Sequence, residues 1–142
     1  MILKDKVSST KWFGLALQSL LVLAEQDGIC PSAVLAQKLE AQSTFLRKIL
    51  ANLVKAGIIS AKEGRDGGYY LARGANEITL KDVYDAMRSD PYSKGFLDVN
   101  SKECFTPSTR SALYDLKDEM ESWLVEGLAK KTISDLLPKE NG

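Results

Sequence analysis

Five polar side chains near the middle of this 142-residue sequence are suited to reading nucleic acid: Gln42, Ser43, Thr44, Arg47 and Lys48. An arginine can donate two hydrogen bonds to guanine, and a glutamine can bond in the same two-point fashion to adenine. Hydroxyl groups serve either bases or phosphates, and lysine suits phosphate. The run therefore predicts a DNA-reading surface. The alternative for Arg47 and Lys48 is an ordinary solvated helix face.

A second group of interest is a loop, residues 63 to 68, in which one arginine, Arg65, stands among three glycines. An arginine on such a loop can enter a narrow minor groove, where the negative potential is strongest. Glycine also permits close approach to the sugar-phosphate backbone. The alternative is a generic hairpin whose glycines only turn the chain.

Charge is distributed unevenly, although the net charge of the whole chain is zero. Residues 38 to 73 carry seven basic and three acidic side chains, a balance of +4, whereas residues 91 to 142 carry seven basic and nine acidic ones, a balance of −2. The basic excess therefore coincides with the two groups above, where phosphates would lie. Lys11, nearer the N-terminus, is expected to hold a further phosphate.

The elements that must position these residues follow from hydrophobic spacing. A first helix is apolar most of the way round, and its main stripe is expected to be Phe13, Ala16, Leu17, Leu20, Leu21 and Ala24. A second helix is expected from Ser32 to about Leu39 and a third from Ser43, with each serine as a helix cap. Glu40 to Gln42 would form the turn between them.

In the third helix the expected inward stripe is Leu46, Ile49, Leu50 and Leu53, with Arg47 and Lys48 on the outward side. Ala56-Gly57 should close it. Two strands, residues 58–62 and 69–73, would then form a hairpin around the glycine loop. Thr79 should cap a fourth helix, and residues 89 to 107 read as irregular.

The predicted fold is mainly α with a small β-hairpin wing: a winged helix-turn-helix domain plus a long C-terminal dimerisation helix. Its expected divisions are a DNA-binding domain over residues 1–88, an irregular linker or sensor segment over 89–107, and a dimerisation helix with its tail over 108–142.

The helix after Pro107, expected to run to about Lys131, carries an apolar stripe at spacings near three and four: Leu113, Leu116, Met120, Trp123, Leu124 and Leu128. Packing onto the first helix is one interpretation, and self-association is the other. Self-association is favoured, because a winged-helix core is already complete by about Met87, and an uncovered stripe would leave a large apolar patch on a monomer.

Several kinds of chemistry find no support in this sequence. No histidine is present, and Cys30 and Cys104 alone form no zinc set, so no metal site is expected. Nucleophile, dinucleotide and P-loop motifs are absent, so no catalytic activity is expected. The longest apolar run, Trp12 to Ala24, is too short to cross a bilayer, and Met1 to Val7 lacks a signal-peptide core, which predicts a cytoplasmic protein with no membrane partner.

With these residues laid out, the chain resembles the Rrf2 family of bacterial winged-helix transcription regulators over residues 8 to 88. The resemblance rests on an ordered set of motifs: Phe13 and Ala16 before LLVLA, FLRKIL at 45–50, LVKAGII at 53–59, GRDGGYYLAR at 64–73 and EITLKDV at 77–83. It implies a homodimer that binds a palindromic operator, usually as a repressor. The third helix of each subunit would enter a major groove and each wing a flanking minor groove.

Two departures from the family pattern matter. Cluster-binding relatives carry three cysteines between the fourth helix and the long helix, whereas this segment holds only Cys104. We therefore expect no iron–sulfur cluster and no other cofactor. Cys104 is either a redox sensor or a passive small side chain. Gln42 stands where relatives often have serine, so the operator sequence is expected to differ.

The main alternative function is a protein-interaction module, in which the winged helix contacts a protein and residues 89 to 107 bind a controlling ligand or enzyme. An unknown small-molecule or protein effector is compatible with either function. Salt dependence separates them, because phosphate binding weakens steeply as salt rises. Two further hypotheses are an enzyme and an iron–sulfur sensor with unusual ligands.

Overall fold

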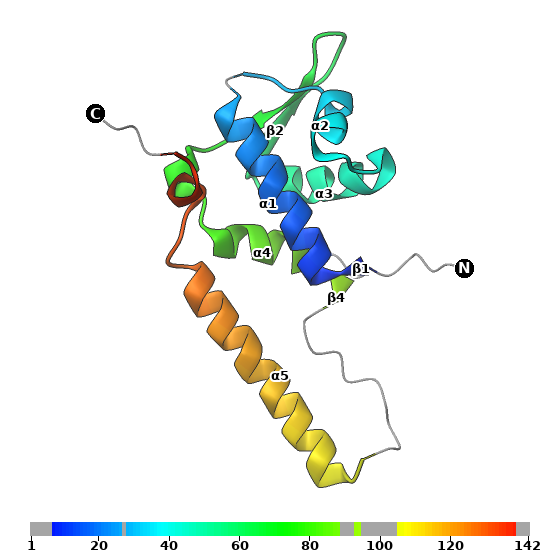
Figure 1. Cartoon of the computed structure of the whole chain (residues 1–142), viewed down its shortest axis with the longest axis vertical. Helices are drawn as coiled ribbons and strands as arrows, with labels where there is room; N and C mark the ends of the chain where they lie inside the picture. The colour runs from blue at the N-terminus through cyan, green and yellow to red at the C-terminus, as the bar shows by residue number, and fades with distance from the viewer. Residues whose placement is uncertain (1–6, 27, 89–92, 95–104, 139–142) are drawn as a thin grey trace.

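Helix α1 (Ser9–Glu25) is the element around which the others pack in the computed structural model (Figure 1), which describes residues 7–26, 28–88, 93–94 and 105–138. It contacts α2, α3, α4 and strand β3. Its buried side chains are Trp12, Ala16, Ser19, Leu20 and Leu23. The Ser19 hydroxyl is satisfied inside this core, because it donates a hydrogen bond to the Leu15 carbonyl at 2.8 Å.

The stripe predicted for α1 was partly wrong. Phe13, Leu17, Leu21 and Ala24 are only half-buried, and the fully buried line begins at Trp12. A helix that is apolar on nearly every side gives periodicity little power to say which side faces the core.

The remaining architecture confirms a mainly helical fold with one antiparallel hairpin. A short parallel pair, β1 (Val7–Ser8) with β4 (Ser93–Lys94), lies apart from that hairpin. Along the chain, the other elements are α2 (Ser32–Leu39), α3 (Ser43–Lys55), β2 (Ile59–Lys62), β3 (Gly68–Leu71), the 3-10 turn η1 (Ala75–Glu77), α4 (Leu80–Arg88), α5 (Pro107–Leu128) and the 3-10 turn η2 (Ile133–Leu136).

Helix ends follow the predicted chemistry in some places and not in others. Thr79 and Asp82 form the expected reciprocal cap of α4, with hydrogen bonds of 3.0 and 3.1 Å. Gly57 closes α3 in a left-handed conformation, φ 77°, as predicted. The caps predicted at Ser32 and Ser43 were wrong, because both residues already lie in the first helical turn.

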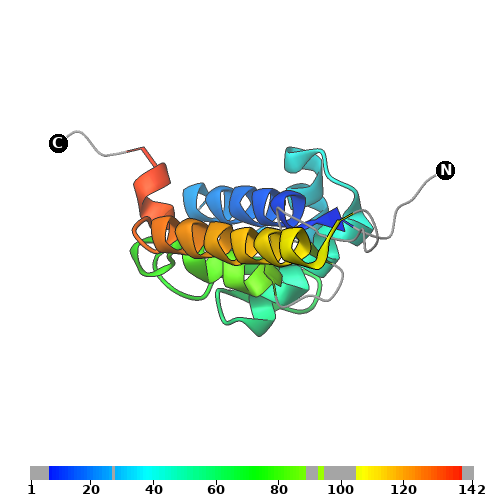
Figure 2. The same cartoon turned by 90° about the horizontal axis from the view of Figure 1, so that it is seen from below.

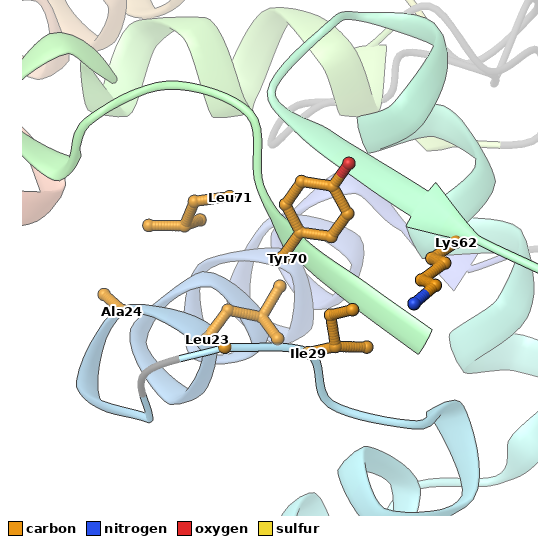
Figure 3. A pocket seen from close by; sticks show the side chains of 7 residues that line it. Leu23, Ala24, Ile29, Lys62, Tyr70 and Leu71 are labelled. Carbon is orange, nitrogen blue, oxygen red and sulfur yellow. The ribbon is translucent and has the colours of Figure 1, made fainter. Parts of the chain in front are cut away.

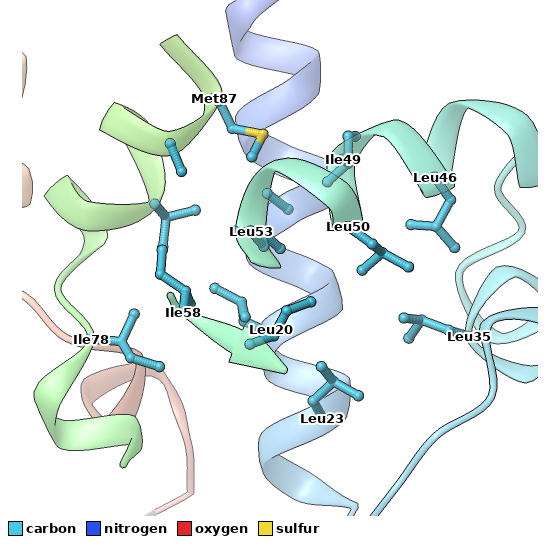
Figure 4. Close-up of a cluster of buried hydrophobic side chains, with 14 of the residues drawn as sticks. Leu20, Leu23, Leu35, Leu46, Ile49, Leu50, Leu53, Ile58, Ile78 and Met87 are labelled. Atoms are coloured by element: carbon cyan, nitrogen blue, oxygen red, sulfur yellow. The ribbon is translucent and has the colours of Figure 1, made fainter. Parts of the chain in front are cut away.

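The hydrophobic core lies between α1, α2, α3, α4 and β2 (Figure 4). The predicted inward residues of α3, Leu46, Ile49, Leu50 and Leu53, are all buried. We call α1 to α4 with the hairpin the head. Its core also receives Ile133, which is completely buried although it follows α5 in the sequence.

The segment that carries Ile133 pairs with the head through an isolated antiparallel β-bridge between Thr132 and Thr79. Its N–H donates to the Ile78 carbonyl at 2.9 Å, and the Leu80 N–H donates to the Lys131 carbonyl at 2.9 Å. Helix α5 therefore ends at Leu128, earlier than the predicted Lys131, so that the chain can turn back and pack. The prediction that the core is complete by about Met87 is therefore wrong, because Ile133 belongs to it. The division into residues 1–88, 89–107 and 108–142 stays a prediction.

Helix α5 leaves the head and runs beneath α1 and α4, as Figures 1 and 2 show. It has no buried residue. Within its predicted stripe, Leu113, Met120, Leu124 and Leu128 are half-buried, whereas Leu116 is 39% and Trp123 61% exposed. In the described ranges, no helix combines the length and apolarity that a membrane span needs.

The packing of Ile133 gives a stability prediction. Ile133→Ala should lower the free energy of unfolding by about 2–4 kcal/mol, because it removes a fully buried side chain and leaves a cavity. Urea denaturation followed by circular dichroism measures the loss. Leu136→Ala is the matched control in the same 3-10 turn, where the side chain is 43% exposed and the expected change is within about 0.5 kcal/mol. Equal losses in the two variants would contradict the role assigned to Ile133.

Candidate nucleic-acid interface

Helix α3 presents its polar side to solvent because its apolar side is fixed in the core. Ser43, Thr44, Arg47 and Lys48 are exposed, as is Gln42 just before the helix. Spacing near 3.6 residues per turn separates these side chains from the buried leucines. The structure therefore brings the five predicted residues together on the outer side and N-terminal end of one helix.

The N-terminal end of α3 is free of a local cap. Gln42 is the N-cap residue in extended conformation, and its side chain makes no capping hydrogen bond. Because Ser43 is not the cap, its hydroxyl accepts no capping hydrogen bond, and neither does the Gln42 side chain. Backbone N–H groups at an uncapped helix start favour an anion such as phosphate.

Lys11 lies next to this helix start although it is far away in sequence. Its Nζ is 6.0 Å from the centre of the Phe45 ring, which packs edge-on against Trp12 with ring centres 5.5 Å apart. Lys11, Gln18 and Gln42 line a common hollow between α1 and α3. Gln18 was given no role from the sequence, where its only signal was a polar residue inside the apolar run Trp12 to Ala24.

The wing consists of β2, β3 and the loop of residues 63–67 between them. Residues Ile59 to Lys62 pair with Leu71 to Gly68 in antiparallel register. Figure 1 shows the wing and α5 projecting from opposite ends of the molecule. Arg65 is exposed on the loop, as predicted, between the acidic residues Glu63 and Asp66.

The loop end of β3 is tied to the segment after α1. Cys30 and Tyr69 exchange two backbone hydrogen bonds, each 2.9 Å. Gly68 makes this approach possible, because a Cβ there would lie 2.5 Å from the Cys30 carbonyl oxygen. The loop therefore begins directly beyond an anchored part of β3, which suits a side chain that must reach into a groove.

Lys62, at the loop end of β2, and Tyr70 of β3 line a hollow shared with Leu23, Ala24 and Ile29 (Figure 3). From the sequence, Lys62 was counted only as one of the basic residues of 38–73. The structure places it directly before the loop that carries Arg65.

One of the seven basic residues counted over residues 38–73, Arg73, forms a salt bridge within the fold. Arg73 pairs with Asp82 at 3.6 Å and donates to the Glu77 carbonyl at 3.4 Å. Within the described part of the chain, six other cations of that segment form no salt bridge: Lys38, Arg47, Lys48, Lys55, Lys62 and Arg65. Such cations can exchange their counterions for DNA phosphates.

The described cysteine, Cys30, is unsuited to reactive chemistry. It is completely buried, and its thiol lies 3.7 Å from the Pro31 carbonyl oxygen. Burial raises the pKa of the Cys30 thiol, which disfavours the thiolate that binds metals or reacts with oxidants. Cys104, the predicted redox residue, lies outside the described residues. Among those described, no three histidine, cysteine or acidic side chains converge as a metal site.

Known proteins resemble this chain in both sequence and fold. YffB of Lactococcus lactis is named as a helix-turn-helix transcriptional regulator. It is 27% identical to this chain over 122 residues, which cover 82% of this chain and 78% of YffB. The transcriptional regulator IscR of Photobacterium profundum is 31% identical over 67 residues, covering 47% of this chain and 39% of IscR. The crystal structure of Staphylococcus aureus CymR matches the fold with a TM-score of 0.66 at 20% identity, covering 93% of this chain and 99% of CymR.

The names of YffB and IscR are both those of transcriptional regulators. The family model Rrf2, described as an iron-dependent transcriptional regulator, matches residues 9–139. That range takes in the head, the wing and α5. The chain therefore belongs to the Rrf2 family of DNA-binding transcriptional regulators.

Proposed function

We propose that this regulator acts as a homodimeric repressor that binds a palindromic operator, with α5 as its dimerisation element. The observation that carries the proposal is the uncovered apolar side of α5. Leu116 is 39% and Trp123 61% exposed on one side of a helix of 22 residues in which no side chain is buried. A helix this apolar and this exposed is typical of an interface between subunits.

The spacing of the apolar residues favours a pair of α5 helices. Leu113, Leu116, Met120 and Trp123 alternate at intervals of three and four, the pattern of a coiled-coil seam. Leu124 and Leu128 stand beside this seam on the side nearer the head, and Leu128 packs against the core. We keep all six as dimerisation residues, with the four seam residues at the centre of the contact.

Symmetry connects the dimer to its operator. Two equal subunits related by a twofold axis present two equal α3 helices, which match two inverted half-sites on DNA. We assign Gln42, Ser43, Thr44 and Arg47 to base edges, Lys11 and Lys48 to phosphates, and Arg65 to the minor groove. Repression follows the family resemblance, and binding to chromosomal DNA would place the protein in the cytoplasm.

Iron is part of the family's description, but the residues of this chain do not fit an iron–sulfur cluster. Such clusters are held by several cysteine thiolates, and the chain has two cysteines. Cys30 is buried in the head with a thiol that resists ionisation. We therefore derive no step of the regulation through iron.

Arg65→Ala tests the wing. We expect operator binding to weaken about tenfold through loss of a charged groove contact, with the free energy of unfolding unchanged within about 0.5 kcal/mol. Fluorescence anisotropy with an operator selected from random duplex DNA measures the affinity. Asp66→Asn is the paired control on the same loop and should strengthen binding, because it removes a negative charge that repels phosphate. Unchanged affinity for Arg65→Ala would contradict the wing assignment.

Arg47 and Lys48 are adjacent on α3, and replacing each with alanine should affect DNA binding differently. Arg47→Ala should cost about 1–3 kcal/mol of binding and relax the base preference at one operator position. Lys48→Ala should weaken all sequences alike and reduce the slope of log affinity against log salt by about one. Repeating the random-duplex selection with each variant, together with a salt titration, separates the two. A uniform loss for Arg47→Ala would make that residue a phosphate contact.

Trp123→Lys tests the dimer. A charge within the seam should dissociate the subunits and weaken binding to a full operator at least about tenfold, because the two heads no longer share one binding event. Sedimentation velocity reports the mass, and Leu136→Lys, an exposed position outside α5, serves as the control. A variant that sediments as a dimer, or a wild-type chain that sediments as a monomer, would refute α5 as the interface.

A further inference from the structure

Helix α5 is joined to the head firmly at one end. The Leu80 N–H donates to the Lys131 carbonyl, and Ile133 is buried in the core just beyond. With no buried residue along its own length, α5 has few packing contacts to fix its direction. A helix attached at a single end is free to swivel about that end.

A cluster of three polar side chains provides a second attachment. The Arg88 guanidinium of α4 forms a salt bridge with the Glu121 carboxylate of α5. The Tyr84 hydroxyl donates to Glu121 Oε2 at 3.1 Å and accepts from Arg88 Nη1 at 3.1 Å. Each member therefore bonds to the other two, across the junction between two helices.

Tyr84 ties this cluster to the interior of the head. Its side chain is buried, and its ring packs edge-on against Phe13 of α1 with ring centres 6.1 Å apart. The Arg88 guanidinium also lies over the Tyr84 ring, 5.7 Å from its centre. The two charged members are about one-third exposed, which places them at the edge of the contact.

A second salt bridge of α4, between Lys81 and Asp85, is an exposed pair within one helix and serves as a comparison. Lys81 and Asp85 are 2.6 Å apart, but both belong to α4 and their side chains are 41% and 52% exposed. That pair can stabilise only its own helix. The Arg88–Glu121 pair joins two elements, and it lies seven residues, about two helical turns, before the end of α5 at Leu128.

We propose that Tyr84, Arg88 and Glu121 are positioning residues that set the angle between the DNA-reading head and α5, and thereby the spacing between operator half-sites that the dimer accepts. The inference rests on the proposed function, in which α5 joins the two subunits. Two points of attachment define the direction of a helix, whereas one does not. Because each subunit carries the same cluster, both heads are held at the same angle.

The geometry makes spacing sensitive to this angle. A helix of 22 residues is about 33 Å long. A swing of about 10° over that length displaces its far end by about 6 Å, which exceeds the ~3.4 Å rise of one base pair. A modest loosening of the cluster therefore lets the heads fit half-sites one or two base pairs nearer or farther apart.

The experiment uses the full chain and a series of duplexes that carry two copies of the selected half-site at increasing separations. We expect the wild-type protein to prefer one separation clearly. Arg88→Met and Glu121→Gln should each flatten that preference at least about threefold, which is within the range of coupling between contacting side chains. Affinity for a single half-site and the sedimenting mass should stay at wild-type values, since neither the reading surface nor the seam is changed.

Three further variants guard against a merely structural effect. Lys81→Met breaks the exposed pair on the same helix and should keep the wild-type spacing preference. Tyr84→Phe removes one hydroxyl while keeping the buried ring, so it should flatten the preference without unfolding the head. Exchanging the charges, Arg88→Glu with Glu121→Arg, should restore part of the preference that either single exchange loses.

The results separate this inference from the proposed function. A wild-type spacing preference that survives unchanged in Arg88→Met, Glu121→Gln and Tyr84→Phe would overturn the positioning role alone. A wild-type chain that is monomeric, or binds no paired site at any separation, would overturn the dimeric function and this inference with it. Flattened preference at unchanged half-site affinity supports both.

Discussion

Burial of one side of α3 is the constraint on which the rest of the molecule depends. Leu46, Ile49, Leu50 and Leu53 fill the space between α1, α2 and α4, and once they are buried the opposite side of the helix must face solvent. The surface that we propose to read DNA therefore follows from core packing, because the polar residues need no contacts of their own to be exposed. Among the described residues, Arg47 and Lys48 form no salt bridge, which fits the proposed contacts with DNA.

Local signals explain what could be predicted. The stripe of α3, the Gly57 ending, the Thr79 cap and the glycine-tipped hairpin each depend on residues within a few positions, so the sequence displays them directly. The five polar residues at and before the start of α3 and Arg65 on the wing follow from the same signals, and the structure places them on the surface. The helix caps at Ser32 and Ser43 failed because one residue of shift separates a cap from a first turn.

Long-range features account for what could not be predicted. Nothing near Ile133 in sequence indicates that it packs beside Ile78, and the pairing of Arg88 with Glu121 joins residues from two separate helices. The approach of Lys11 to the start of α3 has the same origin. Such contacts depend on how elements are arranged in space, which hydrophobic periodicity does not encode. The buried phase of α1 was missed because that helix is apolar on nearly all sides.

Because the chain returns to the head after α5, the head cannot be separated cleanly from the residues that follow that helix. A fragment cut after α4 would expose the socket that Ile133 fills and would leave the Leu80 amide without its carbonyl partner. A chimeric regulator built by fusing this reading module to a foreign oligomerisation segment therefore has to carry the peptide 131–133 along with it, for instance as a short tethered insert.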